Sequence, residues 1–445
     1  MTHSKIAIAA LSLALMATTS MAHAASITEA MASAINTHPQ VLSAEKDQAA
    51  IGHTIDEATA GYKPKVDIAA GTGYEWSKNE TTRFRSARTP QSGKQGSVDM
   101  WRSESRVTAT QMLFDGFQTK SRVAQAKNRF TSAAYHVMDV KNQLALRAAE
   151  SYLDVLHSRE ELALAEENLA THQVYMSKIQ ARVSGGRSSG SDIQQVAGRA
   201  ALAQANIEAA KGDVKKAEAA YLESVGEMPS NPVKDATPFG AIPVNTKAAI
   251  DRAMTQSPVI ASAMADIKAA NAELAEAKSV FCPKVTLEGG ASRNNNLDGV
   301  KGPNNDMTAM VMLRQNLYNG GYDVAQRKER TERVKQAQDM LEGERREVEQ
   351  AVIESYSRLD TAKSRLDPLS QHVQAAIATR DAYVSQFDLG QRTLLDMLDS
   401  EVELFNAKSA LIDGKYELDA SAYAVLAHMG DLAPAVTNGN MVAAK

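Results

Sequence analysis

The stretch VDIAAGTGYEW, residues 66–76, decides the fold because its side chains alternate between apolar and polar with a period of two. One face carries Val66, Ile68, Ala70, Thr72, Tyr74 and Trp76, and the other carries Asp67, Ala69, Gly71, Gly73 and Glu75. Such alternation predicts a β-strand with one apolar face and one wet face. Residues 106–114 repeat the alternation, so they are the return strand of a β-hairpin.

A second hairpin is predicted farther along, so the chain has four strands, at about 64–80, 100–114, 283–296 and 306–318. Four strands cannot close a barrel that encloses a channel, and an open sheet in lipid would leave backbone groups unpaired. Closure in a membrane therefore requires several copies of the chain. The residues leave one alternative open, a soluble β-domain that caps a coiled coil with its apolar face folded inward.

The chain is an internal duplication. Pro64 aligns with Pro283 at an offset of 219 residues, and Gly186 aligns with Gly390 at an offset of 204. One insertion of about fifteen residues in the first hairpin explains the difference. The division is a first repeat at 25–228, a Pro-rich linker at 229–245, a second repeat at 246–432 and a flexible C-terminal tail at 433–445.

Each repeat also contains one long and two short helical segments. The long ones run from about 116 to 183 and 321 to 387, and the first would reach roughly 100 Å, so it must pack against partners. The short ones are expected at 27–61 and 192–225, and again at 246–280 and 394–429. Pro368 should kink the second long helix or split it in two. The fold class is therefore α+β, with coiled-coil helices and one hairpin per repeat.

The N-terminus is typical of an exported protein. Residues 1–24 read as a secretory signal peptide, with Lys5, an apolar run and an A-x-A site at Ala22-His23-Ala24. Cys282 is the only cysteine, so neither a disulfide framework nor an N-terminal lipid-bearing thiol is expected. A net charge of −4 provides no basic field for nucleic acid. No phosphate loop, HExxH or paired-cysteine motif is present, so no enzyme activity, cofactor or metal is predicted.

Two segments carry a resemblance to a known family. FDLGQRTLLDMLDSEVELFNAKSAL, residues 387–411, and GRSSGSDIQQVAGRAALAQANI, residues 186–207, resemble the periplasmic tip of the TolC family of outer-membrane export proteins. The resemblance implies a homotrimer, with a twelve-stranded barrel in outer-membrane lipid above an α-helical tunnel in the periplasm. Pro64 and Pro283 would turn helix into barrel. The segment near 81–97, with Arg83, Arg85, Arg88 and Lys94, would be an extracellular loop without a ligand.

The resemblance also implies the residues of a gate. Asp396 and Asp399 would form carboxylate rings that narrow the pore and select cations, while Arg392, Asp192, Ser191 and Phe387 would form a closed-state latch. The family's best-known member has tyrosine where this chain has Phe387, which cannot donate a hydroxyl hydrogen bond. The surfaces for a periplasmic adaptor would be Gly186, Arg187, Gly190, Gly390, Gln391 and Thr393.

Three functions follow as expectations. The tip resembles the branch serving type I secretion, in which an adaptor and an inner-membrane ABC transporter would pass protein cargo, such as a large adhesin. The alternative within the channel class is the outer-membrane component of a multidrug efflux pump. The alternative from another class is a periplasmic coiled-coil adaptor that does not span the membrane.

Overall fold

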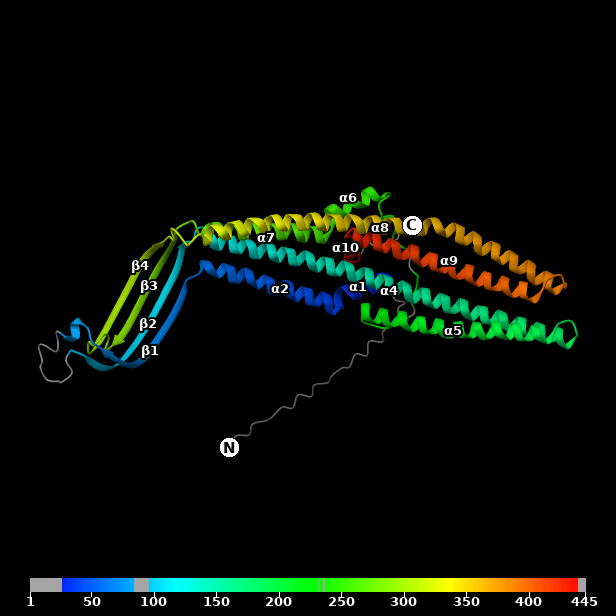
Figure 1. Ribbon diagram of the computed structural model, residues 1–445, viewed down its shortest axis with the longest axis horizontal. Helices are drawn as coiled ribbons and strands as arrows, with labels where there is room; N and C mark the ends of the chain where they lie inside the picture. The colour runs from blue at the N-terminus through cyan, green and yellow to red at the C-terminus, as the bar shows by residue number, and fades with distance from the viewer. Residues whose placement is uncertain (1–25, 84–95, 231, 235–236, 439–445) are drawn as a thin grey trace, which may run out of the picture.

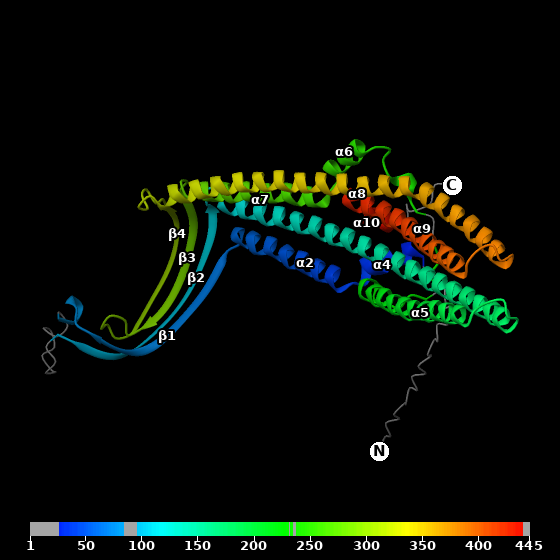
Figure 2. The same cartoon turned by 45° about the vertical axis from the view of Figure 1, so that its right-hand side comes forward.

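The computed structural model describes residues 26–83, 96–230, 232–234 and 237–438, and it shows a curved sheet at one end of a long helical rod (Figures 1 and 2). The predicted signal peptide lies outside the described residues, as do Arg85, Arg88 and Lys94. No helix in the described part of the chain combines the length and apolarity needed to cross a bilayer.

The sheet contains the four predicted strands. They are β1 (Lys65–Ser77), β2 (Val98–Phe114), β3 (Lys284–Asn295) and β4 (Pro303–Arg314), and all neighbours are antiparallel in the order β1-β2-β3-β4. The two hairpins are therefore joined through the β2–β3 pair into one sheet. Strands β1 and β4 each have one neighbour, which leaves both edges free to pair with other copies.

Two helices of equal length form the frame of the rod. They are α4 (Gln118–Ser184) and α8 (Tyr322–Asp388), each with 67 residues. At the end far from the sheet, α5 (Gly190–Val225) packs along α4 and α9 (Leu394–His428) packs along α8. These pairs are called the first coil and the second coil, and they lie side by side because α4 also packs against α9 (Figure 1).

The helices nearer the sheet correct one prediction. Residues 27–61 form α1 (Ile27–Thr37) and α2 (Pro39–Thr59), followed by the short turn η1 (Ala60–Tyr62), and residues 246–280 form α6 (Thr246–Gln256) and α7 (Pro258–Ser279). Pro39 and Pro258 start the second helix of each set, where a missing N–H costs nothing. The prediction of one continuous short helix over each of these two segments was therefore wrong.

Pro368 does not split the second long helix, because α8 continues through it as one helix, so that alternative of the prediction was wrong. Proline leaves the carbonyl of Ser364 without its helical partner, but both residues are exposed, so water can satisfy that carbonyl.

The predicted flexible tail is helical over its first residues. Leu432–Thr437 form α10, and Leu432, Ala433 and Val436 are buried there because this apolar face completes the core.

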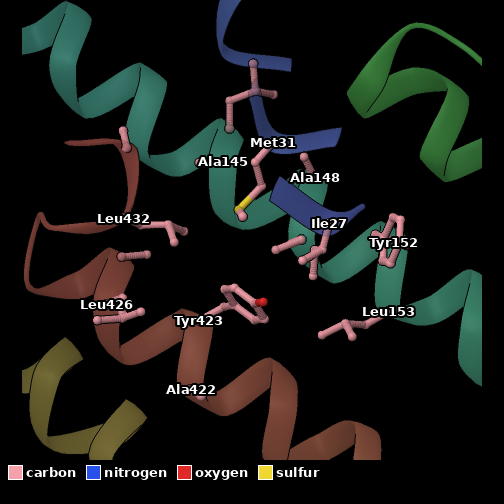
Figure 3. Packing of buried hydrophobic residues seen from close by; sticks show 14 of the residues in the cluster. Ile27, Met31, Ala145, Ala148, Tyr152, Leu153, Ala422, Tyr423, Leu426 and Leu432 are labelled. Carbon is pink, nitrogen blue, oxygen red and sulfur yellow. The ribbon is translucent and has the colours of Figure 1, made fainter. Parts of the chain in front are cut away.

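The core lies midway along the rod, where α1, α4, α9 and α10 meet (Figure 3). Met31, Tyr423, Leu426 and Leu432 are almost fully buried in it. The linker, which includes the turn η2 (Phe239–Ala241), is fastened to this region by one tyrosine from each repeat. Tyr152 exchanges hydrogen bonds with the backbone of Val233, at 2.7 and 2.9 Å, and the Tyr356 hydroxyl donates to the Pro243 carbonyl at 3.0 Å. These tyrosines are 204 residues apart, which fits the duplication.

Candidate functional site: the tip of the helical rod and the faces of the sheet

Both coils end in the same turn, and the two turns together are the tip. Gly186 and Gly390 have φ values of 68° and 80°, which favour glycine. The N–H of Arg187 donates to the Arg182 carbonyl at 2.8 Å, and the N–H of Gln391 donates to the Gln386 carbonyl at 2.8 Å. The residues predicted to dock an adaptor are all exposed here: Gly186, Arg187, Gly190, Gly390, Gln391 and Thr393.

The returning helices begin with the same cap. Ser189 and Thr393 are the N-caps of α5 and α9, and their backbone N–H groups donate hydrogen bonds to Asp192 and Asp396, at 3.0 and 3.3 Å. The Thr393 hydroxyl and N–H both donate to Asp396, which holds the pKa of that carboxyl below its usual range. The structure therefore gives Asp192 and Asp396 a capping role that the sequence prediction did not include.

Asp399 forms a hydrogen bond between the two coils. The surface along which the first coil and the second coil contact each other is called the seam. Its Oδ1 accepts a hydrogen bond from the Arg199 guanidinium of α5 at 2.8 Å. Asp396 and Asp399 lie three residues apart on α9, and each already accepts a hydrogen bond within the chain, from Thr393 and from Arg199. In a trimer, a ring of these carboxylates would therefore lie beside three positively charged Arg199 side chains, one from each copy.

Within one chain, the two charged residues of the predicted latch, Arg392 and Asp192, have separate partners. Arg392 donates to Gln386 at 2.9 Å and stacks over the Tyr383 ring at 4.1 Å, while Asp192 caps α5 beside Ser191. Phe387 is buried between the coils, where the Arg182 guanidinium lies 4.6 Å above its ring. Phe387 therefore contributes packing and a cation–π contact at the position where a tyrosine would offer a hydroxyl.

The sequence prediction missed a buried polar cluster in the seam above the tip. Tyr175 of α4 donates from its hydroxyl to Glu401 of α9 at 2.5 Å, and Arg380 of α8 donates to the same Glu401 oxygen at 3.1 Å. Glu401 is 4% exposed, and the neighbouring His172 is 2% exposed. A signal existed, because Glu401 stands at core spacing after Leu394 and Leu398, but charged residues at such positions have no identifiable partner in sequence alone.

Charge separates the two faces of the sheet. Directly opposed residues share a face, and the face of Val66 holds only Asp99 and Arg293 as charged residues over the four strands. The other face holds five basic and five acidic residues, which are Lys65, Arg102, Arg106, Lys284 and Arg314 with Asp67, Glu75, Glu104, Glu288 and Asp306. This is the division expected between a lipid face and a lumen face.

Aromatic residues mark both ends of the apolar face. Tyr74 and Trp101 lie opposite each other near the outer loops, and both are more than 60% exposed. Phe117 and Tyr318 are exposed where the sheet joins the helices. Side chains of this kind gather at the two interfaces of a bilayer. Pro64 and Pro283 each precede the first residue of a strand, β1 and β3, at this same junction.

A two-faced sheet with open edges, mounted on a rod of paired helices, defines a subunit of an outer-membrane channel whose barrel closes by association of copies. Three copies supply the twelve strands of the predicted barrel. The chain belongs to the outer membrane efflux protein family, because the sequence model of that family matches residues 30–227 and 249–431, one match for each repeat.

Similarities to individual proteins support this assignment. The chain is 27% identical over 321 residues to the outer membrane efflux protein BepC of Brucella suis, covering 72% of this chain and 70% of BepC. It is 23% identical over 402 residues to the outer membrane protein TolC of Vibrio cholerae, covering 88% of each chain. It is 22% identical over 324 residues to the alkaline protease secretion protein AprF of Pseudomonas aeruginosa, covering 70% of this chain and 66% of AprF. The crystal structure of CusC aligns with a TM-score of 0.78 at 16% identity, covering 91% of each chain.

These findings confirm the family resemblance, the fold class and the location in the outer membrane with a tunnel reaching the periplasm. Members of this family are channels and not enzymes. A periplasmic adaptor that does not span the membrane is therefore excluded. The relatives include both efflux and secretion proteins by name, so the class of cargo is a separate question.

Proposed function

We propose that this chain forms the outer-membrane channel of a type I secretion system and exports protein cargo, such as a large adhesin. The observation that carries the proposal is the tip, whose sequence from Phe387 to Leu411 resembles the branch serving type I secretion. The similarity to AprF, which is named for secretion of an alkaline protease, supports it over 70% of the chain.

The polar face of the sheet fits an unfolded protein as cargo. Its five basic and five acidic residues cancel, and several are paired in place, such as Arg102 with Glu75 at 2.7 Å and Arg314 with Glu288 at 2.9 Å. A lumen without net charge would neither retain nor exclude a passing chain by its charge. Selection would then rest with the adaptor and the ABC transporter in the inner membrane.

The tip would be the gate in this proposal. An adaptor would bind the exposed turns at Gly186 and Gly390, and the second coil would move relative to the first. Asp396 and Asp399 would line the narrowest part of the pore. Arg392 and Asp192 would tie one copy to the next, because within one chain neither is the other's partner. An exposed ion pair of this kind is worth about 0–1 kcal/mol, which suits a gate that must open.

Deleting the gene tests the choice of cargo. Culture supernatants and surface proteins of the deletion strain are compared by mass spectrometry with those of the parent, and drug susceptibility is measured in parallel. We expect one or a few large secreted proteins to disappear, with drug tolerance unchanged. Restored secretion from a plasmid-borne copy is the control.

The second candidate is the outer-membrane component of a multidrug efflux pump. It is favoured by the similarity to BepC, which is named an outer membrane efflux protein. Under this alternative the deletion strain becomes sensitive to small toxic compounds and its secreted proteins are unchanged. That result would refute type I secretion for this chain.

A further inference from the structure

His157, Glu161 and Asp413 converge on one point of the seam between the coils. Among the residues that the structure describes, they form a group whose imidazole nitrogen and carboxylate oxygens all lie within 4.8 Å of one another. His157 and Glu161 are four residues apart on α4, so their side chains share one face of that helix. Asp413 comes from the facing side of α9, and its Oδ1 lies 2.7 Å from His157 Nε2.

One buried carboxylate oxygen of this group accepts no hydrogen bond from the described residues. Glu161 Oε2 accepts a hydrogen bond from the Ser409 hydroxyl at 3.1 Å, but Glu161 Oε1 is closed off from solvent and has no hydrogen-bond partner among the described residues. A buried carboxylate oxygen without a partner costs free energy, so a cation or a donor bound at this oxygen would stabilise the group.

The surroundings are acidic and open to a small solute. A cavity of about 580 Å³ adjoins the group, and Asp154, Asp213 and Lys216 also line it. Burial raises the pKa of both Asp154 and Glu161, because loss of water disfavours the charged form of a carboxyl group. His157 and Asp413 are 30% and 60% exposed, so an ion can reach them from water.

The imidazole is also held in position. Its ring makes an edge contact with the Tyr416 ring, with centroids 5.4 Å apart, and the Tyr416 hydroxyl donates to Glu160 at 2.9 Å. A fixed ring reduces the side-chain entropy lost when a ligand binds. The group is therefore partly preorganised around His157.

We propose that His157, Glu161 and Asp413 form a Zn²⁺ site that joins the first coil to the second coil. One imidazole and two carboxylates suit Zn²⁺, and two carboxylates cancel its charge, whereas Mg²⁺ and Ca²⁺ prefer sites made only of oxygen. Tetrahedral ligands at about 2.0–2.2 Å from zinc lie roughly 3.3 Å apart. The His157 to Asp413 distance then opens by about 0.6 Å, which side-chain rotation can supply, and water from the cavity completes the coordination.

The test is a Zn²⁺ titration of the purified, chelator-treated trimer in detergent at pH 7, in which isothermal titration calorimetry measures the stoichiometry and affinity of binding. The variants His157→Ala and Asp413→Asn each remove one ligand, and Asp413→Asn does so with almost no change of shape. The matched control is His372→Ala, because His372 makes a similar pair with Glu403, at 2.9 Å, and the described part of the chain offers no third ligand there. Trimer assembly of every variant is checked by its heat-modifiable migration on gels.

We expect one Zn²⁺ per chain in the unaltered protein and in His372→Ala, with affinity at least about 10-fold weaker in both site variants. MgCl₂ should give no such binding. Absence of Zn²⁺ binding to the unaltered trimer overturns the proposal, and so does full affinity in both site variants. Equal loss in His372→Ala would place the bound zinc elsewhere and overturn it as well. None of these readouts depends on the nature of the exported cargo.

Discussion

The hydrogen bond from Tyr175 to Glu401 gives the sharpest prediction about gating. Tyr175→Phe removes one hydroxyl and leaves Glu401 with Arg380 alone. A hydrogen bond to a charged group contributes about 1.5–3 kcal/mol. Since Tyr175 belongs to the first coil while Glu401 and Arg380 belong to the second, this loss falls on a contact that would break if the coils separate as proposed. The closed state should therefore lose roughly 10- to 150-fold in its equilibrium against the open state.

The assay is single-channel recording of purified trimers in planar lipid bilayers. Tyr175→Phe should raise the open probability or the mean conductance clearly above that of the unaltered channel. The control is Tyr356→Phe, which also removes a tyrosine hydroxyl but at the linker, from the Pro243 carbonyl. If Tyr175→Phe behaves like the unaltered channel, or if Tyr356→Phe opens the pore equally, the buried cluster does not hold the coils together.

Three further predictions concern the seam and the sheet junction. Arg199→Ala breaks an exposed pair worth about 0–1 kcal/mol, so conductance should rise by less than about fivefold; a larger rise would mean that Asp399 carries the closed state. Burial lowers the pKa of His172, whose ring faces Tyr175, Glu401 and Arg199. The closed contact between the coils is therefore most stable above about pH 6.5. It loses stability at lower pH, because His172 takes up a proton more readily once the coils have opened. Conductance should therefore rise below that pH, and His172→Gln should flatten the profile. Gly116→Ala should lower thermal stability by about 1–3 kcal/mol, because a Cβ would lie 2.5 Å from Cys282 Cβ, whereas Gly186→Ala, with a similar φ and open space, should cost less.

Local patterns predicted most of the fold. The alternation at 66–76 and the prolines before each first strand gave hairpins whose bounds agree with β1 to β4 within a few residues. Gly186 and Gly390 marked the tip end of each coil, because a left-handed residue after a helix is a local requirement. Information carried by neighbouring residues is sufficient for features of this kind.

The breaks at Pro39 and Pro258 show where an available signal was given too little weight. His38 and Ser257 align with each other, and each is followed by proline, which is the pattern of a helix start. Both segments are otherwise rich in good helix formers, so continuity appeared favourable. The break at each site lets the short helix α1 or α6 leave the line of the rod and pack against the middle of α4 or α8.

The side-chain pairs that join the two coils could not be predicted from the sequence, for a physical reason. Tyr175 and Glu401 are 226 positions apart, and His157 and Asp413 are 256 apart, so no local pattern joins them. The duplication does not help, because the counterparts at an offset of 204 do not repeat the chemistry. Tyr175, Arg380, Glu401, His157 and Asp413 correspond to Thr379, Met176, Ala197, Thr361 and Ala209.

That asymmetry has a structural cause. Turns and caps act within one coil, so both copies of the coil need them, and Ser189 with Asp192 matches Thr393 with Asp396. The contact between α4 and α9 joins two different surfaces, so a side chain on one has no reason to recur on the other. Polar residues at core spacing in one repeat, with small or apolar residues at the same place in the other, therefore indicate where the two coils meet. Glu401 against Ala197 satisfies this rule, and it marks the seam as a part of the chain where the two repeats differ.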